Sequence, residues 1–340
     1  MSNRWPGGLI RKTPVTPAGP FQNGAAPGVW TLAEAAFWTK QGLWPIAGNV
    51  ATETFAIFAL GCNGCVGLTT RDKYTYSGCV VSTGGAATVA SYLGAAAGNS
   101  TVGIFALGFA PSSGSTTRDK YTYSGCVVGA GGAATVASYA GSAAGNSTVG
   151  IFALGRNSGG SAVTTRNKYT YSGCVVSAGG AATTASTSGS AAGNSTVGIF
   201  ALGNVCFANS TTRNKYTYSG CVVSAGGAAT VASLQGSAAG TGTVGIFALG
   251  YNCSSGAITT RNKYTYSGDV VATGGAATVA SRLSSAAGNS TVGIFALGLG
   301  APTTRNKYTY SGCVVSAGGA ATVASYAGSA ASNGTTGVNM

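Results

Sequence analysis

The chain has 340 residues, of which 45% are hydrophobic and only 7% are charged, which excludes a charge-rich disordered chain. It has no histidine and only five carboxylates, which excludes imidazole catalysis, histidine metal sites and carboxylate clusters. We therefore expect no enzymatic activity, no cofactor and no metal site, and the absence of an apolar run of about 18 residues argues against membrane insertion.

The first 45 residues differ in composition from the rest and are expected to form a separate, extended docking arm. They hold all four tryptophans and six of the eight prolines, but no cysteine. A proline-rich segment such as 1–29 buries too little apolar surface to fold alone. Thr31 and Glu34 fit a capping box and Gly42 fits a C-cap, which predicts one short helix over residues 32–41. No basic segment followed by an apolar run is present, so no secretory signal is expected.

The tryptophans of this arm have two candidate roles. Three of them could simply close one end of the repeat domain. Alternatively, the arm could dock onto another protein, because aromatic side chains anchor interfaces. The candidate docking residues are Trp5, Trp30, Trp38 and Trp44.

Residues 1–8 read Met-Ser-Asn-Arg-Trp-Pro-Gly-Gly, and residues 28–45 read Gly-Val-Trp-Thr-Leu-Ala-Glu-Ala-Ala-Phe-Trp-Thr-Lys-Gln-Gly-Leu-Trp-Pro. This sequence resembles the leader on virion structural proteins of tailed phages, notably cyanophages, where similar leaders precede various repeat domains. The resemblance implies a tail, fibre or capsid-decoration component that contacts other virion proteins and is present in several copies on a particle. It also implies localisation to the virion, with assembly in the host cytoplasm and release by lysis.

The rest of the chain is built from repeats. The motif Arg-(Asp/Asn)-Lys-Tyr-Thr-Tyr-Ser-Gly occurs six times, and so does Phe-Ala-Leu-Gly. The distance from each Thr-Thr pair to the end of the next Phe-Ala-Leu-Gly is 40 residues in all five complete units. The segments between these blocks have 4 to 8 residues and unrelated sequences. A constant frame with one variable loop per unit predicts that the loops lie on a single face.

Each unit is expected to contain four short strands. Residues alternate with a period of two, so that Tyr74 and Tyr76 share one face of their strand. Four strands in about 47 residues match one blade of a β-propeller. The Ala-Ala-Gly segment is assigned to the innermost strand, because blades converge at the centre and leave room there only for small side chains.

The ends of the repeat region predict how the ring closes. Residues 53–61 copy the second strand but have no first strand before them, and residues 326–333 supply that missing strand. An all-β fold follows, with a six-bladed propeller over residues 46–340 closed by strands from both ends of the region. A β-solenoid is the rival, but it would need distinct capping units.

The order of the small-residue strand, Gly-Ile-Phe-Ala-Leu-Gly and Lys-Tyr-Thr-Tyr resembles a kelch repeat over residues 46–333. The second glycine and the tryptophan of the kelch pattern are missing. The resemblance therefore implies a kelch-like fold and nothing further about function.

The cysteines form two sets. Five occupy one repeat position, where the fifth unit has Asp269, and are expected to be buried thiols in a small slot: Cys79, Cys126, Cys174, Cys221 and Cys313. The others lie in variable loops. Of these, Cys206 and Cys253 hold the same offset in adjacent units and form a candidate disulfide, provided their Cα atoms come within about 7 Å.

Twelve of the 18 basic residues belong to the repeated octapeptide and dominate the net charge of +13. They are expected to form a ring that either makes hydrogen bonds between neighbouring blades or attracts an anionic glycan or surface. Their even spread argues against nucleic acid as a partner. The residues are Arg71, Lys73, Arg118, Lys120, Arg166, Lys168, Arg213, Lys215, Arg261, Lys263, Arg305 and Lys307.

The favoured function is that of a virion structural protein whose arm docks to the particle and whose propeller is displayed. Exposed variable loops would allow adhesion to a host surface glycan. The alternative is a soluble lectin-like or scaffold propeller unrelated to virions.

Overall fold

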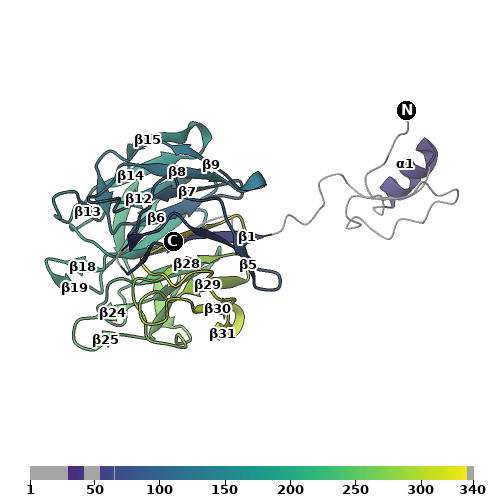
Figure 1. Ribbon diagram of the computed structural model, residues 1–340. Helices are drawn as coiled ribbons and strands as arrows, with labels where there is room; N and C mark the ends of the chain where they lie inside the picture. Colours follow the sequence, from purple (N-terminus) through teal and green to yellow (C-terminus); the bar gives the residue numbers. More distant parts are fainter. Residues whose placement is uncertain (1–29, 42–53, 65, 335–340) are drawn as a thin grey trace. The chain divides into compact units, whose positions relative to one another are not determined.

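The computed structural model describes residues 30–41, 54–64 and 66–334, and it divides the chain into two compact units, Met1–Glu53 and Thr54–Met340. The predicted boundary at residue 45 lies outside the described residues. The first unit contains the helix α1 (Leu32–Lys40). The second unit is a six-bladed β-propeller, in which six four-stranded antiparallel sheets surround a central axis (Figure 1).

The predicted helix and its capping box are confirmed. The backbone N–H of Glu34 donates to Oγ1 of Thr31 at 3.2 Å, and the N–H of Thr31 donates to Oε2 of Glu34 at 2.8 Å. This reciprocal pair satisfies donors that the first turn of a helix leaves unpaired. The helix ends at Lys40 with Gln41 as its C-cap, and the expected cap Gly42 lies outside the described residues.

The blades are numbered 1 to 6 in the order of their second strands. The innermost strands of blades 1 to 6 are β32 (Ser329–Ser332), β6 (Ala95–Gly98), β11 (Ser142–Gly145), β16 (Ser190–Gly193), β22 (Ser237–Gly240) and β28 (Ser285–Gly288). The second strands are β1 (Phe55–Ala59), β7 (Val102–Ala106), β12 (Val149–Ala153), β17 (Val197–Ala201), β23 (Val244–Ala248) and β29 (Val292–Ala296). The third strands are β4 (Arg71–Thr75), β8 (Arg118–Thr122), β14 (Arg166–Thr170), β20 (Arg213–Thr217), β26 (Arg261–Thr265) and β30 (Arg305–Thr309). The outermost strands are β5 (Val80–Thr83), β9 (Val127–Gly131), β15 (Val175–Ala178), β21 (Val222–Gly226), β27 (Val270–Thr273) and β31 (Val314–Ala317).

Small residues occupy the centre, as the sequence predicts. Ala143 and Ala144 of β11 are fully buried, like their counterparts in the other innermost strands. Neighbouring blades approach so closely there that a Cβ on Gly198 would lie 3.1 Å from the Cβ of Ala144 in the preceding blade. Larger side chains at these positions would force the blades apart.

The ring closes in the predicted way. Strand β32 pairs antiparallel with β1, and the register sets Ala56 opposite Ser332 and Ala59 opposite Ser329. Strand β1 pairs on its other side with β4. Blade 1 is therefore composite, because its innermost strand comes from the other end of the propeller sequence. This closure distinguishes the propeller from a solenoid and leaves no open edge at the axis.

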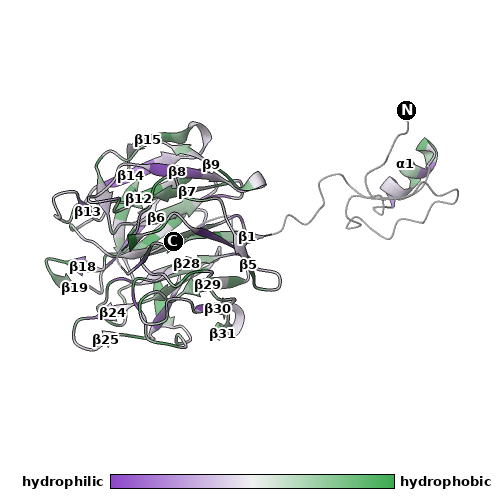
Figure 2. Cartoon of the chain, in the orientation of Figure 1, coloured by the Kyte–Doolittle hydropathy of each residue, from purple (hydrophilic) through white to green (hydrophobic). Residues whose placement is uncertain are grey.

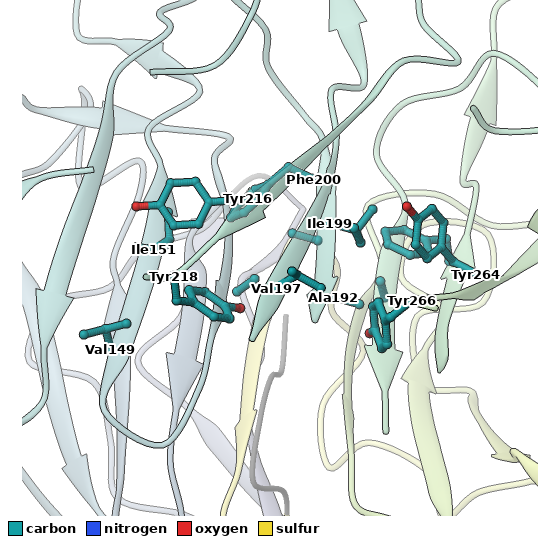
Figure 3. Close-up of a cluster of buried hydrophobic side chains, with 14 of the residues drawn as sticks. Val149, Ile151, Ala192, Val197, Ile199, Phe200, Tyr216, Tyr218, Tyr264 and Tyr266 are labelled. Atoms are coloured by element: carbon teal, nitrogen blue, oxygen red, sulfur yellow. The ribbon is translucent and has the colours of Figure 1, made fainter. Parts of the chain in front are cut away.

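Larger side chains fill the wedge between blades. In blade 4, Ile199, Phe200, Tyr216 and Tyr218 are buried, and they pack with their counterparts in the adjacent blades (Figure 3). Hydropathy differs between inner and outer strands. Strands near the centre are mostly hydrophobic, whereas third strands such as β8 contain hydrophilic residues, drawn in purple (Figure 2). The constant frame of the sequence is thus the packing surface between blades.

Candidate functional site: the variable face

All the variable segments lie at one end of the blades. Each leaves a second strand after Phe-Ala-Leu-Gly and returns to a third strand at its arginine. Four of them contain or join short two-stranded pairs: β2 (Cys62–Asn63) with β3 (Val66–Gly67), β10 (Ser138–Tyr139) with β13 (Arg156–Asn157), β18 (Asn204–Val205) with β19 (Ala208–Asn209), and β24 (Tyr251–Asn252) with β25 (Gly256–Ala257). Figure 1 shows β13, β18–β19 and β24–β25 along one side of the propeller. We call this surface the variable face.

A second set of variable residues lies beside these loops. The tetrapeptide before each innermost strand differs between units at its two middle positions, for example Tyr92-Leu93 and Arg282-Leu283. The first of these residues bridges in antiparallel fashion to the first residue of a variable loop. The pairs are Tyr92 with Phe109, Tyr139 with Arg156, Thr187 with Asn204, Leu234 with Tyr251, Arg282 with Leu299, and Tyr326 with Cys62. Variation in the sequence is therefore concentrated in two adjoining rings on one face.

Aromatic and cationic side chains cluster in two sectors of this face. Between blades 2 and 3, the rings of Tyr92 and Phe109 are 5.2 Å apart, and Phe109 is 5.2 Å from Tyr139 in an edge-to-face arrangement. Across the ring, the guanidinium of Arg282 lies 4.8 Å from the centroid of Tyr251. All of these side chains are partly exposed. Half-exposed rings next to polar loops are typical of surfaces that bind other molecules.

The variable face carries positive but no negative charge among its described residues. Its charged side chains are Arg156 and Arg282, and no Asp or Glu lies in the described parts of its loops. Hydroxyl and amide groups make up most of the remaining polar surface. A neutral or anionic ligand fits this chemistry better than a cationic one.

The centre of the variable face is a ring of backbone hydrogen bonds. The residue before each Gly or Ser that leads into an innermost strand has a φ between 51° and 59°, in the left-handed region. Each of these residues donates its N–H to the carbonyl of its counterpart in the preceding blade at 2.8 Å, and the six bonds close a circle. The members are Leu93, Ala140, Ser188, Gln235, Leu283 and Ala327. Below them the channel holds a cavity of about 60 Å³, large enough for a few water molecules.

We call the opposite surface the constant face: its turns are nearly the same in all blades, with exceptions at Thr241-Gly242 and Asp269, and β32 ends and β1 begins there. There, Oδ1 of Asn146 accepts from the N–H groups of Thr148 and Val149, and its Nδ2 donates to the carbonyl of Ser195 in the next blade at 3.1 Å. The N–H of Phe55, where β1 begins, donates to Oδ1 of Asn333 at 2.7 Å. Strand β1 therefore begins at the end of blade 1 remote from the variable loops.

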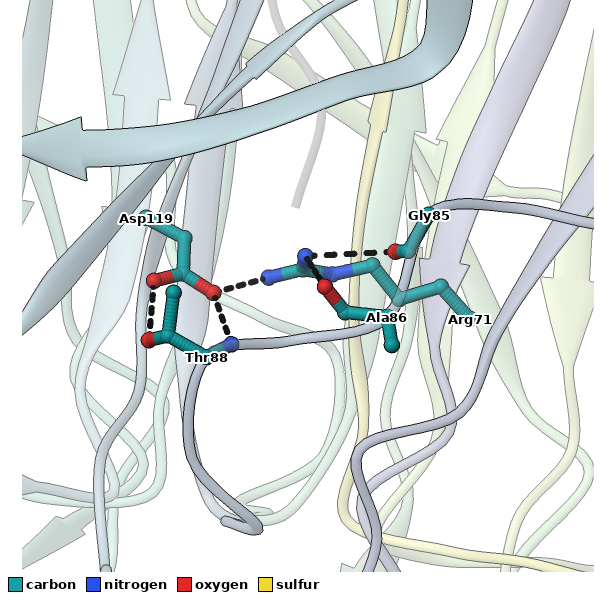
Figure 4. Close-up of polar contacts among 5 residues, drawn as sticks. All are labelled: Arg71, Gly85, Ala86, Thr88 and Asp119. Atoms are coloured by element: carbon teal, nitrogen blue, oxygen red, sulfur yellow. Dashed lines mark hydrogen bonds and ion pairs between the residues drawn. The ribbon is translucent and has the colours of Figure 1, made fainter.

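The six repeated arginines lie between blades, where they are at most 2% exposed. Nη2 of Arg71 donates to Oδ2 of Asp119 in the next blade at 2.8 Å, and Nη1 donates to the carbonyls of residues 85 and 86 (Figure 4). The guanidinium also lies 4.7 Å from the centroid of Phe105 in that blade. Of the two roles expected for these residues, hydrogen bonding between blades is the one found. The arginine half of the predicted ring is too deeply buried for an external anion to reach.

Burial also changes the pKa of these arginines. Loss of hydration lowers the pKa of four of them to about 10, since each faces a neutral asparagine: Arg118, Arg166, Arg213 and Arg261. They remain charged at neutral pH. Arg118, Arg213 and Arg261 donate to backbone carbonyls of their own blades, and all four guanidinium groups lie over Phe rings of the next blade. The net charge of the chain is thus partly internal.

The lysine half of the ring is partly exposed on the flanks of the blades. Nζ of Lys215 donates to Oδ2 of Asp269 in the next blade at 3.0 Å, and Nζ of Lys73 lies 4.3 Å from the centroid of Phe55. Asp269 sits in the turn between β26 and β27, at the end of the blade away from the variable face. An anion-binding role of the lysines therefore remains a prediction that concerns the flanks.

Two of the four predicted docking tryptophans can be placed. Trp38 lies in α1 and Trp30 directly precedes its capping residue, and both are partly exposed. Trp5 and Trp44 lie outside the described residues. The docking role of the four side chains stays a prediction.

The candidate disulfide is not formed. Cys206 and Cys253 are exposed, free thiols at the tips of hairpins in adjacent blades. The thiol of Cys253 is directed to Oδ1 of Asn209, at 3.2 Å, instead of to Cys206. The expectation for the repeated cysteines also needs correction, because they are half-buried and lie in a tight turn with φ of 54–55°. They adopt this conformation because they follow the Ser-Gly of the turn between the third and outermost strands.

The sequence matches no protein-family model, and a search of curated proteins finds no match either. In the described part of the chain, no group of three or more His, Cys, Asp or Glu could hold a metal ion, and no helix is long and apolar enough to cross a membrane.

Proposed function

We propose that the protein is a structural component of a phage virion, held by its N-terminal arm and displaying the propeller for recognition of a host surface. The observation that carries this proposal is the concentration of sequence variation on one face of an otherwise repetitive ring. A protein that served only as a spacer would have no reason to keep its frame nearly constant and vary mainly this face.

The position at which β1 begins is compatible with docking by the N-terminal arm and recognition by the variable face. Strand β1 begins at the constant face, where the N–H of Phe55 donates to Asn333. Attachment through the N-terminal side of β1 therefore does not require the variable face. The resemblance of residues 1–45 to leaders of tailed-phage virion proteins supports a particle as the object to which the arm docks.

The chemistry of the variable face supports a glycan as its ligand. Aromatic rings such as Tyr92 and Tyr139 offer flat apolar surfaces to sugar rings, and Arg156 and Arg282 can donate to hydroxyl or acidic groups. A soluble lectin-like propeller would use the same face, so the arm decides between the two functions.

Deletion of residues 1–45 tests the docking role. When a phage encodes only the truncated protein, we expect mass spectrometry to find no propeller in purified virions. Circular dichroism should show that the free truncated protein is folded. Truncated protein that still joins the particle in normal amount would contradict the docking role and favour the soluble alternative.

Substitution on the variable face tests recognition. We expect Tyr92→Ala/Tyr139→Ala to reduce attachment of the full-length protein to host cells at least tenfold, as is usual when two interface anchors are lost. The matched control is Ser100→Ala/Ser147→Ala, at exposed turns of the constant face, which should leave attachment unchanged. Equal attachment of both variants would exclude this sector as the recognition site.

A further inference from the structure

The six contacts that join the blades through arginine are not chemically equal. Each arginine donates through Nη2 to the residue after the arginine of the next blade. Four of these acceptors are asparagines, at 3.0–3.1 Å: Asn167, Asn214, Asn262 and Asn306. Two are buried carboxylates, Asp119 at 2.8 Å from Arg71 and Asp72 at 2.6 Å from Arg305. We call the contacts to asparagine amide latches and the contacts to aspartate ionic latches.

Both ionic latches flank the same blade. Arg305 belongs to blade 6 and reaches Asp72 in blade 1, whereas Arg71 belongs to blade 1 and reaches Asp119 in blade 2. Blade 1 is the composite blade, built from β32 and from β1, β4 and β5. The remaining four junctions of the ring have amide latches.

The composite blade differs from the others in its covalent connections. In blades 2 to 6, a short turn ties the innermost strand to the second strand, so that the two stay close even when their hydrogen bonds break. In blade 1 no turn joins β32 to β1, and non-covalent contacts keep them together: the pairing between residues 56–59 and 329–332, the hydrogen bonds between Phe55 and Asn333, and the bridge between Cys62 and Tyr326. Separation of these strands releases far more conformational freedom than fraying of a hairpin does.

We propose that Asp72 and Asp119 hold the ring closed by strengthening both junctions of its one non-covalently assembled blade. All six arginines are already desolvated, so the unfavourable transfer of a guanidinium from water applies at every junction. At the two junctions of blade 1, a carboxylate supplies the countercharge that an asparagine cannot. The contact to asparagine joins a charged donor to a neutral acceptor, whereas the contact to aspartate joins two opposite charges, and their Coulomb attraction is stronger in a poorly hydrated site than in water.

The surroundings of each latch accommodate either residue. At an ionic latch, Oγ1 of Thr88 donates to Oδ1 of Asp119 at 2.6 Å. At an amide latch, the direction is reversed, and Nδ2 of Asn167 donates to Oγ1 of Thr135 at 2.8 Å. A threonine hydroxyl can rotate to serve as donor or acceptor. Exchange of Asp and Asn therefore converts one kind of latch into the other without steric change. The location of the ionic latches in the ring can then be changed while the shape of the side chains stays the same.

The test compares three full-length proteins by native-state hydrogen exchange. The first is the wild type and the second is Asp72→Asn/Asp119→Asn, which has six amide latches. The third carries Asn214→Asp and Asn262→Asp in addition, which restores two ionic latches but places them around blade 4. The third variant has the same composition, the same net charge and the same number of buried ion pairs as the wild type.

In both variants we expect the amides of β1 and β32 to exchange faster than in the wild type, by about fivefold for each ionic latch lost at blade 1. In the third variant the amides of β16 and β17 should exchange at the wild-type rate or more slowly. Wild-type exchange of β1 and β32 in the third variant would overturn the proposal, because the number of ion pairs rather than their position would then matter. Equal acceleration in all six blades of the second variant would overturn it as well.

Discussion

The space between blades and the variable face follow opposite rules, although the same repeats build both. Between blades, each unit repeats one set of buried residues, such as Ile199, Phe200, Tyr216 and Tyr218 of blade 4. On the variable face, the units share almost no side chains, and Phe207 at the tip of β18–β19 is 93% exposed. Residue identity in the frame is therefore limited by packing against the two adjacent blades. On the variable face, residue identity is limited only at positions whose backbone pairs with another segment.

The largest expected effect concerns the frame at high pH. Burial raises the pKa of twelve tyrosines, two in each blade, above the ordinary value of about 10. A phenol that ionises more easily in the unfolded chain stabilises the native state below pH 10, and this contribution is lost as the pH rises beyond it. We expect cooperative unfolding above pH 10, with the phenolate absorbance and the circular dichroism changing together.

Five arginines oppose this trend. Burial lowers the pKa of Arg71, and it lowers that of Arg118, Arg166, Arg213 and Arg261 to about 10, so the native state gains relative to the unfolded chain as the pH rises above the lowered pKa. Twelve phenols outnumber five guanidinium groups, and the net effect is destabilisation. Ionisation of most tyrosines without unfolding would show that the space between blades is hydrated. The contrast between a packed frame and an exposed variable face would then not hold.

The next largest effect is expected from loss of one latch. Arg213→Ala leaves Oδ1 of Asn262 and the carbonyl of Gly227 without the donor they have at 3.0 and 3.3 Å, and it opens a cavity beside Phe247. Oδ1 of Asn262 keeps the N–H of Thr230 as a donor at 3.1 Å, whereas the carbonyl of Gly227 loses the guanidinium. The lost hydrogen bonds and the cavity together should lower the free energy of unfolding by about 3 kcal/mol or more, measured by denaturant titration. A loss below about 1 kcal/mol would mean that the arginines contribute little to the frame.

The smallest effect is expected on the variable face. Phe207→Ala should change the free energy of unfolding by less than about 0.5 kcal/mol, because the side chain is exposed. Phe200→Ala, the same substitution at a buried site of the same blade, serves as the control and should cost about 3–5 kcal/mol. Similar costs for the two phenylalanines would show that the hairpin is part of the frame and would remove the distinction between the two regions.

Much of the frame could be predicted because its signals repeat six times. Strand periodicity, the small residues of the innermost strand and the split blade are all local features, visible within one unit or at the ends of the repeat region. The helix α1 was equally accessible, since Thr31 and Glu34 form its cap three residues apart.

Hydrogen bonding between blades was one of the two roles expected for the arginines, but the partners in each latch were harder to foresee because they belong to different units. Arg71 and Asp119 are 48 positions apart, and an arginine in a polar octapeptide favours the interpretation of an exposed charge. The restriction of the following position to Asp or Asn was the available signal, since both offer an acceptor of the same shape. The second variable ring was also missed, although differences such as Tyr92 against Thr187 interrupt an otherwise constant unit.

The ring of backbone hydrogen bonds at the centre of the variable face has a consequence for how the protein can evolve. Since N–H and carbonyl groups alone make this circle, the side chains of Leu93, Ala140, Ser188, Gln235, Leu283 and Ala327 are released from any role in its closure. None of the six is β-branched, which is the restriction that a left-handed backbone imposes. Within that limit, single substitutions can change the side chains at the entrance of the channel without breaking the circle of six backbone hydrogen bonds.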